Sequence, residues 1–221
     1  MTLETQNTLL SGIDPEITER LVTDRRAFFK RSVVGLGALA SAPMVLAMTA
    51  QQAFGQELPQ DIKDVLNFAL TLEHIEDYFY RTGLATDGLI PAEYLDVFRH
   101  IGLHEAEHVA LLESVLGADA VARPHIDATA GGQYADVLEN FDTYLTLSQT
   151  LEDLGVAAYK GQAPNLIEND DILQTALRIH SVEARHAAMV RKIGGMKPWE
   201  DAFDEPMTKE EVLEAAQPFL A

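Results

Sequence analysis

Two short stretches decide how this sequence folds: residues 105–108 read Glu-Ala-Glu-His, and residues 183–186 read Glu-Ala-Arg-His. Residues three apart lie on one face of a helix, so each stretch can present a carboxylate and an imidazole together. Glu-x-x-His pairs also arise by chance, so their position in the chain must decide their meaning. Each pair falls near the middle of a segment with helical periodicity, which favours a buried and shared role.

From residue 59 onward the chain predicts helices and no convincing strand. In the first segment, apolar residues recur at steps of three and four from Val65 to Phe79. Gly83 is expected to stop this helix and Gly161 to follow the end of the third. The four predicted helices span 59–83, 91–116, 133–159 and 170–193.

The lengths of the connections predict the topology. Short links join the first helix to the second and the third to the fourth, as in antiparallel hairpins, whereas residues 118–132 form a long crossover. The sequence therefore predicts an all-α fold, a ferritin-like four-helix bundle with one long crossover, over residues 56–195. Residues 196–221 form a C-terminal tail. A capping-box pattern at Thr208–Glu211 predicts a short helix ending near Pro218, packed on the outside of the bundle.

A weak twofold repeat runs through the predicted bundle. Glu73 precedes Glu105 by 32 residues, and Glu152 precedes Glu183 by 31. Each partner glutamate is followed seven residues later by a tyrosine, Tyr80 or Tyr159. Four carboxylates and two imidazoles in an apolar bundle need compensating charge, which two divalent cations would supply.

Six residues are the predicted metal ligands: Glu73, Glu105, His108, Glu152, Glu183 and His186. Oxygen and nitrogen ligands without thiolate favour two iron or manganese ions, with zinc as a further option. Glu76 is an alternative to Glu73 because it lies one helical turn away, although the spacing to the tyrosine favours Glu73. A surface or satisfied core position is expected for the other histidines, with His100 and His104 able to lie at the rim of the site and His74 and His180 beside ligand positions.

This ligand pattern resembles that of the ferritin-like superfamily, which includes bacterioferritin and rubrerythrin, over residues 60–193. The tail over residues 199–219 is similar to that of exported ferritin-like domain proteins related to plant desiccation proteins. The resemblance implies Glu105 and Glu183 as bridging ligands, Glu73 and Glu152 as terminal ligands, and one histidine per metal.

A rival interpretation uses residues 104–108, which also read His-Glu-x-x-His, the zinc metalloprotease motif. His104 and His108 would then bind zinc and Glu105 would activate water. That site needs a third ligand downstream and normally a sheet that aligns the substrate. No segment predicts such a sheet, and the second Glu-x-x-His stays unexplained.

Residues 1–55 are interpreted as a targeting segment rather than as part of the folded domain. Arg25-Arg26 precede Phe-Phe-Lys and an apolar stretch rich in Gly and Ala, which resembles a twin-arginine export signal. Cleavage would start the mature chain near Gln56. The expectation is an exported, periplasmic protein that uses the export machinery, or a membrane-anchored one if the signal is kept. The alternative is an ordinary amphipathic or anchoring helix.

Composition narrows the function classes. The formal net charge is −19, which argues against nucleic acid as a partner, and the chain has no cysteine for thiolate or iron–sulfur sites. The favoured function is a dimetal oxidoreductase that acts on dioxygen or peroxide in oxidative stress. The alternatives are an iron-oxidising storage protein, a manganese catalase-like enzyme and a non-catalytic metal-binding or stress protein. The sequence leaves a homo-oligomer open.

Overall fold

The computed structural model describes residues 58–199 and 201–220, and they form helices joined by turns. Within these ranges the only strand-like pairing is an isolated antiparallel bridge between Ile126 and Leu220. The prediction of an all-α fold is therefore confirmed. The predicted export signal lies outside the described residues.

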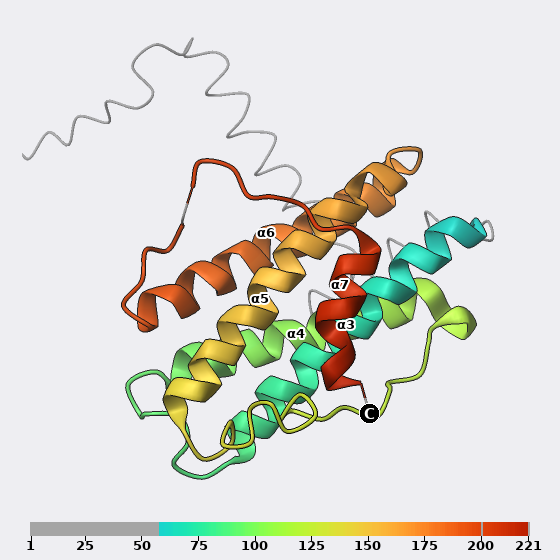
Figure 1. Cartoon of the computed structure of the whole chain (residues 1–221). Helices are drawn as coiled ribbons and strands as arrows, with labels where there is room; N and C mark the ends of the chain where they lie inside the picture. The colour runs from blue at the N-terminus through green and yellow to red at the C-terminus, as the bar shows by residue number, and fades with distance from the viewer. Residues whose placement is uncertain (1–57, 200, 221) are drawn as a thin grey trace, which may run out of the picture. The chain divides into compact units, whose positions relative to one another are not determined.

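Four long helices build the bundle, and they are arranged as two hairpins (Figure 1). The first hairpin pairs α3 (Gln60–Ala85) with α4 (Leu95–Leu116), and the second pairs α5 (Phe141–Gln162) with α6 (Asp170–Ile193). Helices α3 and α5 pack against each other and so join the hairpins. Short 3₁₀ turns follow α4 and α5, at Gly117–Asp119 and Ala163–Leu166.

Helix α5 begins later than predicted, so the crossover is longer. Residues 133–139 form turns, and the helix begins after Asn140, whose side chain accepts a hydrogen bond from the Asp142 amide at 3.0 Å. The Asp127 carboxylate organises the preceding loop by accepting bonds from Thr129, and backbone φ is positive at residues 130–132. The predicted start at residue 133 is wrong. Val137 is buried as a helix residue would be, but it lies in a turn before the helix begins. Helix α4 also begins later, at Leu95 rather than residue 91.

Two glycines expected to end helices instead permit close packing. Helix α3 continues past Gly83 to Ala85, and α5 continues past Gly161 to Gln162. A Cβ at position 83 would collide with the Tyr144 ring, and one at position 161 with the Met207 carbonyl oxygen. These glycines are therefore required by neighbouring segments rather than by the end of a helix.

The apolar core is divided into two clusters, and the predicted ligands lie where one gives way to the other. On α4, Phe98 and Ile101 belong to the first cluster, whereas Leu111 and Leu112 belong to the second. On α6, Ile172, Ala176 and Ile179 belong to the second cluster and Val190 to the first. Both Glu-x-x-His motifs therefore occupy a buried polar layer between two apolar ones.

The tail returns to the bundle. Its helix α7 (Lys209–Ala216) begins with the predicted capping box between Thr208 and Glu211, and a 3₁₀ turn, Gln217–Phe219, follows it. Val212 and Ala216 are fully buried in the first apolar cluster. The Met207 amide donates to the Ala157 carbonyl of α5 at 3.2 Å, so the tail is bonded to the second hairpin.

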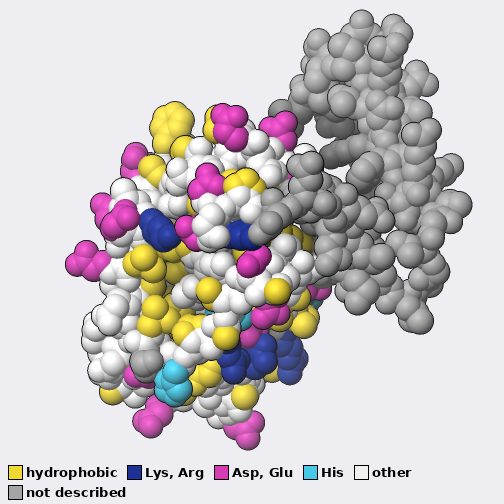
Figure 2. Space-filling model, turned by 90° about the vertical axis from the view of Figure 1, so that its right-hand side faces the viewer, with side chains coloured by type: hydrophobic (Ala, Val, Ile, Leu, Met, Phe, Trp, Pro, Cys, Tyr) yellow, Lys and Arg dark blue, Asp and Glu magenta, His cyan; other side chains and the backbone are white. Residues whose placement is uncertain are grey.

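Figure 2 shows acidic side chains scattered over this face of the molecule, with exposed hydrophobic side chains and a few basic ones between them. This distribution agrees with the formal net charge of −19. Among the described helices, none combines the length and apolar character that crossing a bilayer would require.

Candidate metal centre

All four bundle helices contribute to one buried cluster. Helix α3 supplies Glu73, α4 supplies Glu105 and His108, α5 supplies Glu152, and α6 supplies Glu183 and His186. The four carboxylates are fully buried, and the two histidines are 8% and 5% exposed. Helical spacing explains the pairing on α4 and α6, since residues three apart share a face. The structure thus brings together all six residues predicted from the sequence.

The six residues form two overlapping groups. Glu73 and His108 belong to the first group and Glu152 and His186 to the second, while Glu105 and Glu183 belong to both. Within each group, one ligand atom per residue lies within 4.8 Å of every other. A cation in each group would thus have two glutamates in common with its neighbour.

Each histidine points one ring nitrogen at three carboxylates. His108 Nδ1 lies 3.0 Å from Glu183 Oε1, 3.1 Å from Glu105 Oε2 and 3.2 Å from Glu73 Oε2. A single N–H satisfies one such acceptor well, not three. Convergence of one nitrogen and three oxygens on a common point is the arrangement that a bound cation would complete.

His186 repeats the arrangement in the second group. Its Nδ1 lies 2.9 Å from Glu105 Oε1, 3.3 Å from Glu152 Oε2 and 3.8 Å from Glu183 Oε2. All four of these atoms are buried and none has a hydrogen bond of good geometry among the described residues. Buried polar atoms rarely stay unsatisfied, so their donor chemistry fits a metal ion.

Two tyrosines fix the outer glutamates across the hairpins. The Tyr159 hydroxyl on α5 donates to Glu73 Oε1 on α3, and the Tyr80 hydroxyl on α3 donates to Glu152 Oε1 on α5, each at 2.5 Å. Hydrogen bonds to ligating carboxylates orient them and tune the metal. The tyrosine seven residues after each outer glutamate therefore bonds to the outer glutamate of the other helix, not to the one on its own helix.

Without a cation, protons must stabilise this cluster. Burial raises the pKa of Glu73 to about 8 and also raises that of Glu152. Burial opposes charge on the histidines, but the carboxylates that face them prevail, so the pKa of His186 is raised to about 12 and that of His108 is also raised. Burial likewise opposes ionisation of Glu183, yet its close contacts with both histidines lower its pKa to about 2. Metal binding must displace these protons.

Glu73 and Glu76 were alternatives in the sequence, and the structure buries both. Glu73 lies in the first group of ligand atoms, whereas Glu76 lies in neither. Glu76 is 3% exposed, and its Oε1 atom has no hydrogen-bond partner among the described residues. Burial and the neighbouring carboxylates, chiefly Glu183, raise its pKa well above the usual value. The sequence could not show that both glutamates are buried.

The remaining histidines occupy different surroundings. His104 Nδ1 lies 2.9 Å from His186 Nε2, and the two rings stack with centroids 5.2 Å apart. His100 is exposed and contacts the backbone oxygen of Asp96. His74 is buried and His180 half-buried, and burial lowers the pKa of both.

The metalloprotease interpretation gains no support from this geometry. His108 shares its group with three glutamates, and His104 is in neither group. Residues 58–199 and 201–220 also contain no sheet that could align a peptide substrate.

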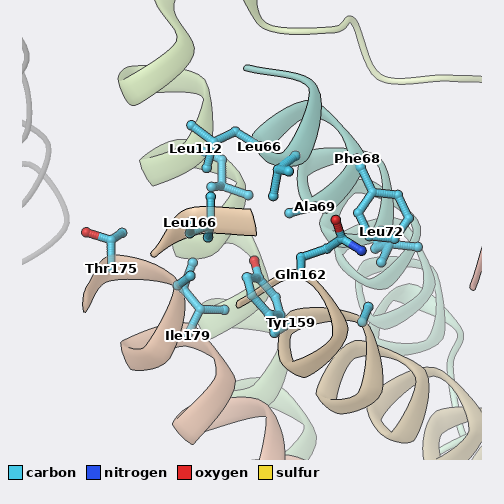
Figure 3. Close-up of a pocket in the computed structure, with 13 residues that line it drawn as sticks. Leu66, Phe68, Ala69, Leu72, Leu112, Tyr159, Gln162, Leu166, Thr175 and Ile179 are labelled. Carbon is cyan, nitrogen blue, oxygen red and sulfur yellow. The ribbon is translucent and has the colours of Figure 1, made fainter. Parts of the chain in front are cut away.

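A small apolar pocket lies beside the cluster (Figure 3). Side chains of α3, α4, α5, α6 and the Ala163–Leu166 turn line it, among them Leu66, Leu112 and Ile179. Tyr159 forms part of its wall while its hydroxyl bonds to Glu73. The pocket has room for about one water molecule.

The fold and the cluster together define a class: a four-helix bundle with a carboxylate–histidine core that could hold metal ions. The family model described as "Ferritin-like domain" matches residues 61–195, which include all but the first residue of the four long helices. The chain therefore belongs to the ferritin-like domain family. No match was found among curated proteins.

Proposed function

We propose that this protein binds two transition-metal ions, iron or manganese, between its four helices and is exported to the periplasm, where the pair reacts with dioxygen or peroxide. One observation carries the metal-binding part: each of two buried histidine nitrogens faces three carboxylate oxygens from three different glutamates. The paired arginines in residues 1–55 support the export part.

Each residue of the cluster would have a distinct role in holding the two ions. Glu105 and Glu183 are in both groups and would bridge the ions, while Glu73 and Glu152 would each bind one. When bound, iron or manganese ions supply redox chemistry. The tyrosines hold the outer carboxylates, and the apolar layers on both sides keep bulk water from the cluster.

The first test is elemental analysis of the full-length chain purified from the compartment to which it is exported. It compares the wild type with the double variant Glu105→Gln/Glu183→Gln, which removes both shared charges at nearly constant volume. The matched control is Glu93→Gln/Glu210→Gln, because both of these glutamates are exposed. We expect two iron or manganese ions per chain in the wild type and control and none in the Glu105/Glu183 variant.

Two results would contradict the proposal. One is a wild type that holds no metal and takes up none when the metal-free protein meets Fe(II) or Mn(II). The other is an unchanged metal content in the Glu105/Glu183 variant. A single zinc that survives replacement of Glu183 would favour the metalloprotease interpretation instead. The oxygen chemistry is measured separately, as consumption of dioxygen or peroxide by the loaded protein.

A further inference from the structure

Glu76 is a buried carboxylate that the six-residue cluster leaves unused. It lies on α3 one turn after Glu73 and is 3% exposed. Its Oε1 atom is buried and has no hydrogen-bond partner among the described residues. A buried carboxylate oxygen without a partner is costly, so a residue of this kind calls for a reason.

The side chain of Glu76 is directed toward the cluster at the point where Gly155 leaves space. A Cβ at position 155 would lie 3.2 Å from Glu76 Oε1 and 3.4 Å from Glu183 Oε2, so both oxygens lie against the same glycine. Gly155 follows Glu152 by three residues, as Glu76 follows Glu73. Glu76 on α3 and Gly155 on α5 therefore occupy equivalent positions of the twofold repeat, and they lie next to each other.

Water is a poor alternative partner for Glu76. The cavity that Glu76 and Gly155 line has room for at most about one water molecule. Its other lining residues are all aliphatic: Leu72, Ile75, Leu151 and Leu154. A single water held there would lack the two to four polar partners that buried waters normally have.

We propose that Glu76 is a fifth carboxylate ligand of the metal pair, reaching it from the side of Glu183 through the space left by Gly155. A change of side-chain rotamer about the Cα–Cβ and Cβ–Cγ bonds brings its oxygen toward the cations, because no side chain at position 155 blocks it. The two metal positions would then be unequal, because the repeat is broken here and α5 has Gly155 where α3 has Glu76. This inference rests on the proposed function, because it needs the metal pair.

The test is a titration of metal-free, full-length protein with Co(II), followed by visible absorption, and with Mn(II), followed by calorimetry. The variants are Glu76→Gln, which keeps the shape and removes the charge, and Glu76→Asp, which keeps the charge and withdraws the carboxylate. Glu93→Gln is the matched control on an exposed glutamate. Circular dichroism of each metal-free variant verifies that the helices form.

We expect both Glu76 variants to bind two ions but to lose about tenfold or more in affinity for one of them, as changes in a metal environment typically do. Their Co(II) spectra should also differ from the wild type, because the coordination number of one ion falls. A purely structural role would leave the Co(II) spectrum unchanged.

Wild-type affinity and spectra in both variants would overturn the inference while leaving the proposed function standing. A wild type that takes up no Co(II) or Mn(II) would overturn the proposed function, and this inference with it.

Discussion

The stability of the metal-free protein should fall steeply as the pH rises above neutrality. Glu73 has a pKa of about 8 in the fold against 4.5 in the unfolded chain, and His186 about 12 against 6.5. Between pH 6.5 and 8 the folded state therefore keeps at least these two protons, which the unfolded state releases, and the raised pKa values of Glu76, Glu152 and His108 add to the effect. Each retained proton lowers the unfolding free energy by about 1.4 kcal/mol per pH unit, so Glu73 and His186 alone account for about 4 kcal/mol over this window.

Other groups lower the unfolding free energy as the pH falls. Glu183, with its pKa lowered to about 2, adds stability that is present above pH 4.5 and lost as the pH falls through 2. The lowered pKa values of His74, His104 and His180 also cost stability below pH 6.5, because the unfolded chain protonates them first. The metal-free protein should thus be most stable between about pH 4.5 and 6.5, where the loss from Glu73 on raising the pH and the loss from these histidines on lowering it oppose each other.

The assay is urea unfolding followed by circular dichroism at half-unit pH steps, with and without two equivalents of Mn(II). A loss of about 4 kcal/mol is a large part of the 5–15 kcal/mol typical of a domain, so it is readily measured. With metal bound, the protons are already displaced, and stability should hold or rise over the same window. A flat metal-free curve from pH 6.5 to 8 would refute the reasoning, as would an equal fall with metal present.

Three further variants test other parts of the structure. Tyr159→Phe removes the hydroxyl that orients Glu73, so metal affinity should fall about tenfold in a chelator competition, whereas an unchanged affinity would make the bond incidental. His104→Ala removes the ring bonded to His186 Nε2, and a similar loss is expected by the same competition, with exposed His100→Ala as its control. Gly83→Ala forces a methyl group into a tyrosine ring, so it should lower the unfolding free energy by about 1–3 kcal/mol in urea, and a gain in stability would contradict that packing.

The cluster was predictable from the sequence because its residues obey a local rule and a repeated spacing. Glu105 and His108 lie three apart on one helix face, and Glu73 precedes them by the length of a hairpin. The spacing to the tyrosine favoured Glu73 over Glu76, and Glu73 is the one found in a ligand group, but the spacing could not show that Glu76 is buried beside the cluster as well. It also could not find the bond from His104 to His186, which lie 82 residues apart.

The start of α5 was missed for a related reason. Val137 lies in a stretch whose apolar spacing fits a helix, but the Asp127 turn and three positive φ angles hold it in a loop. Its burial comes from packing against the bundle rather than from helical periodicity. Gly83 and Gly161 were likewise misread, because the segments that need them are distant in the sequence.

The exchange of tyrosines between the hairpins makes the two halves of the bundle incomplete by themselves. Each half carries the glutamate and histidine of one metal group, yet it relies on the other half for a shared glutamate and for the hydroxyl that steadies its outer carboxylate. The hairpins therefore cannot part without exposing four carboxylates and breaking both tyrosine bonds. The cluster thus ties the two hairpins together, and a cation bound there would hold them closed.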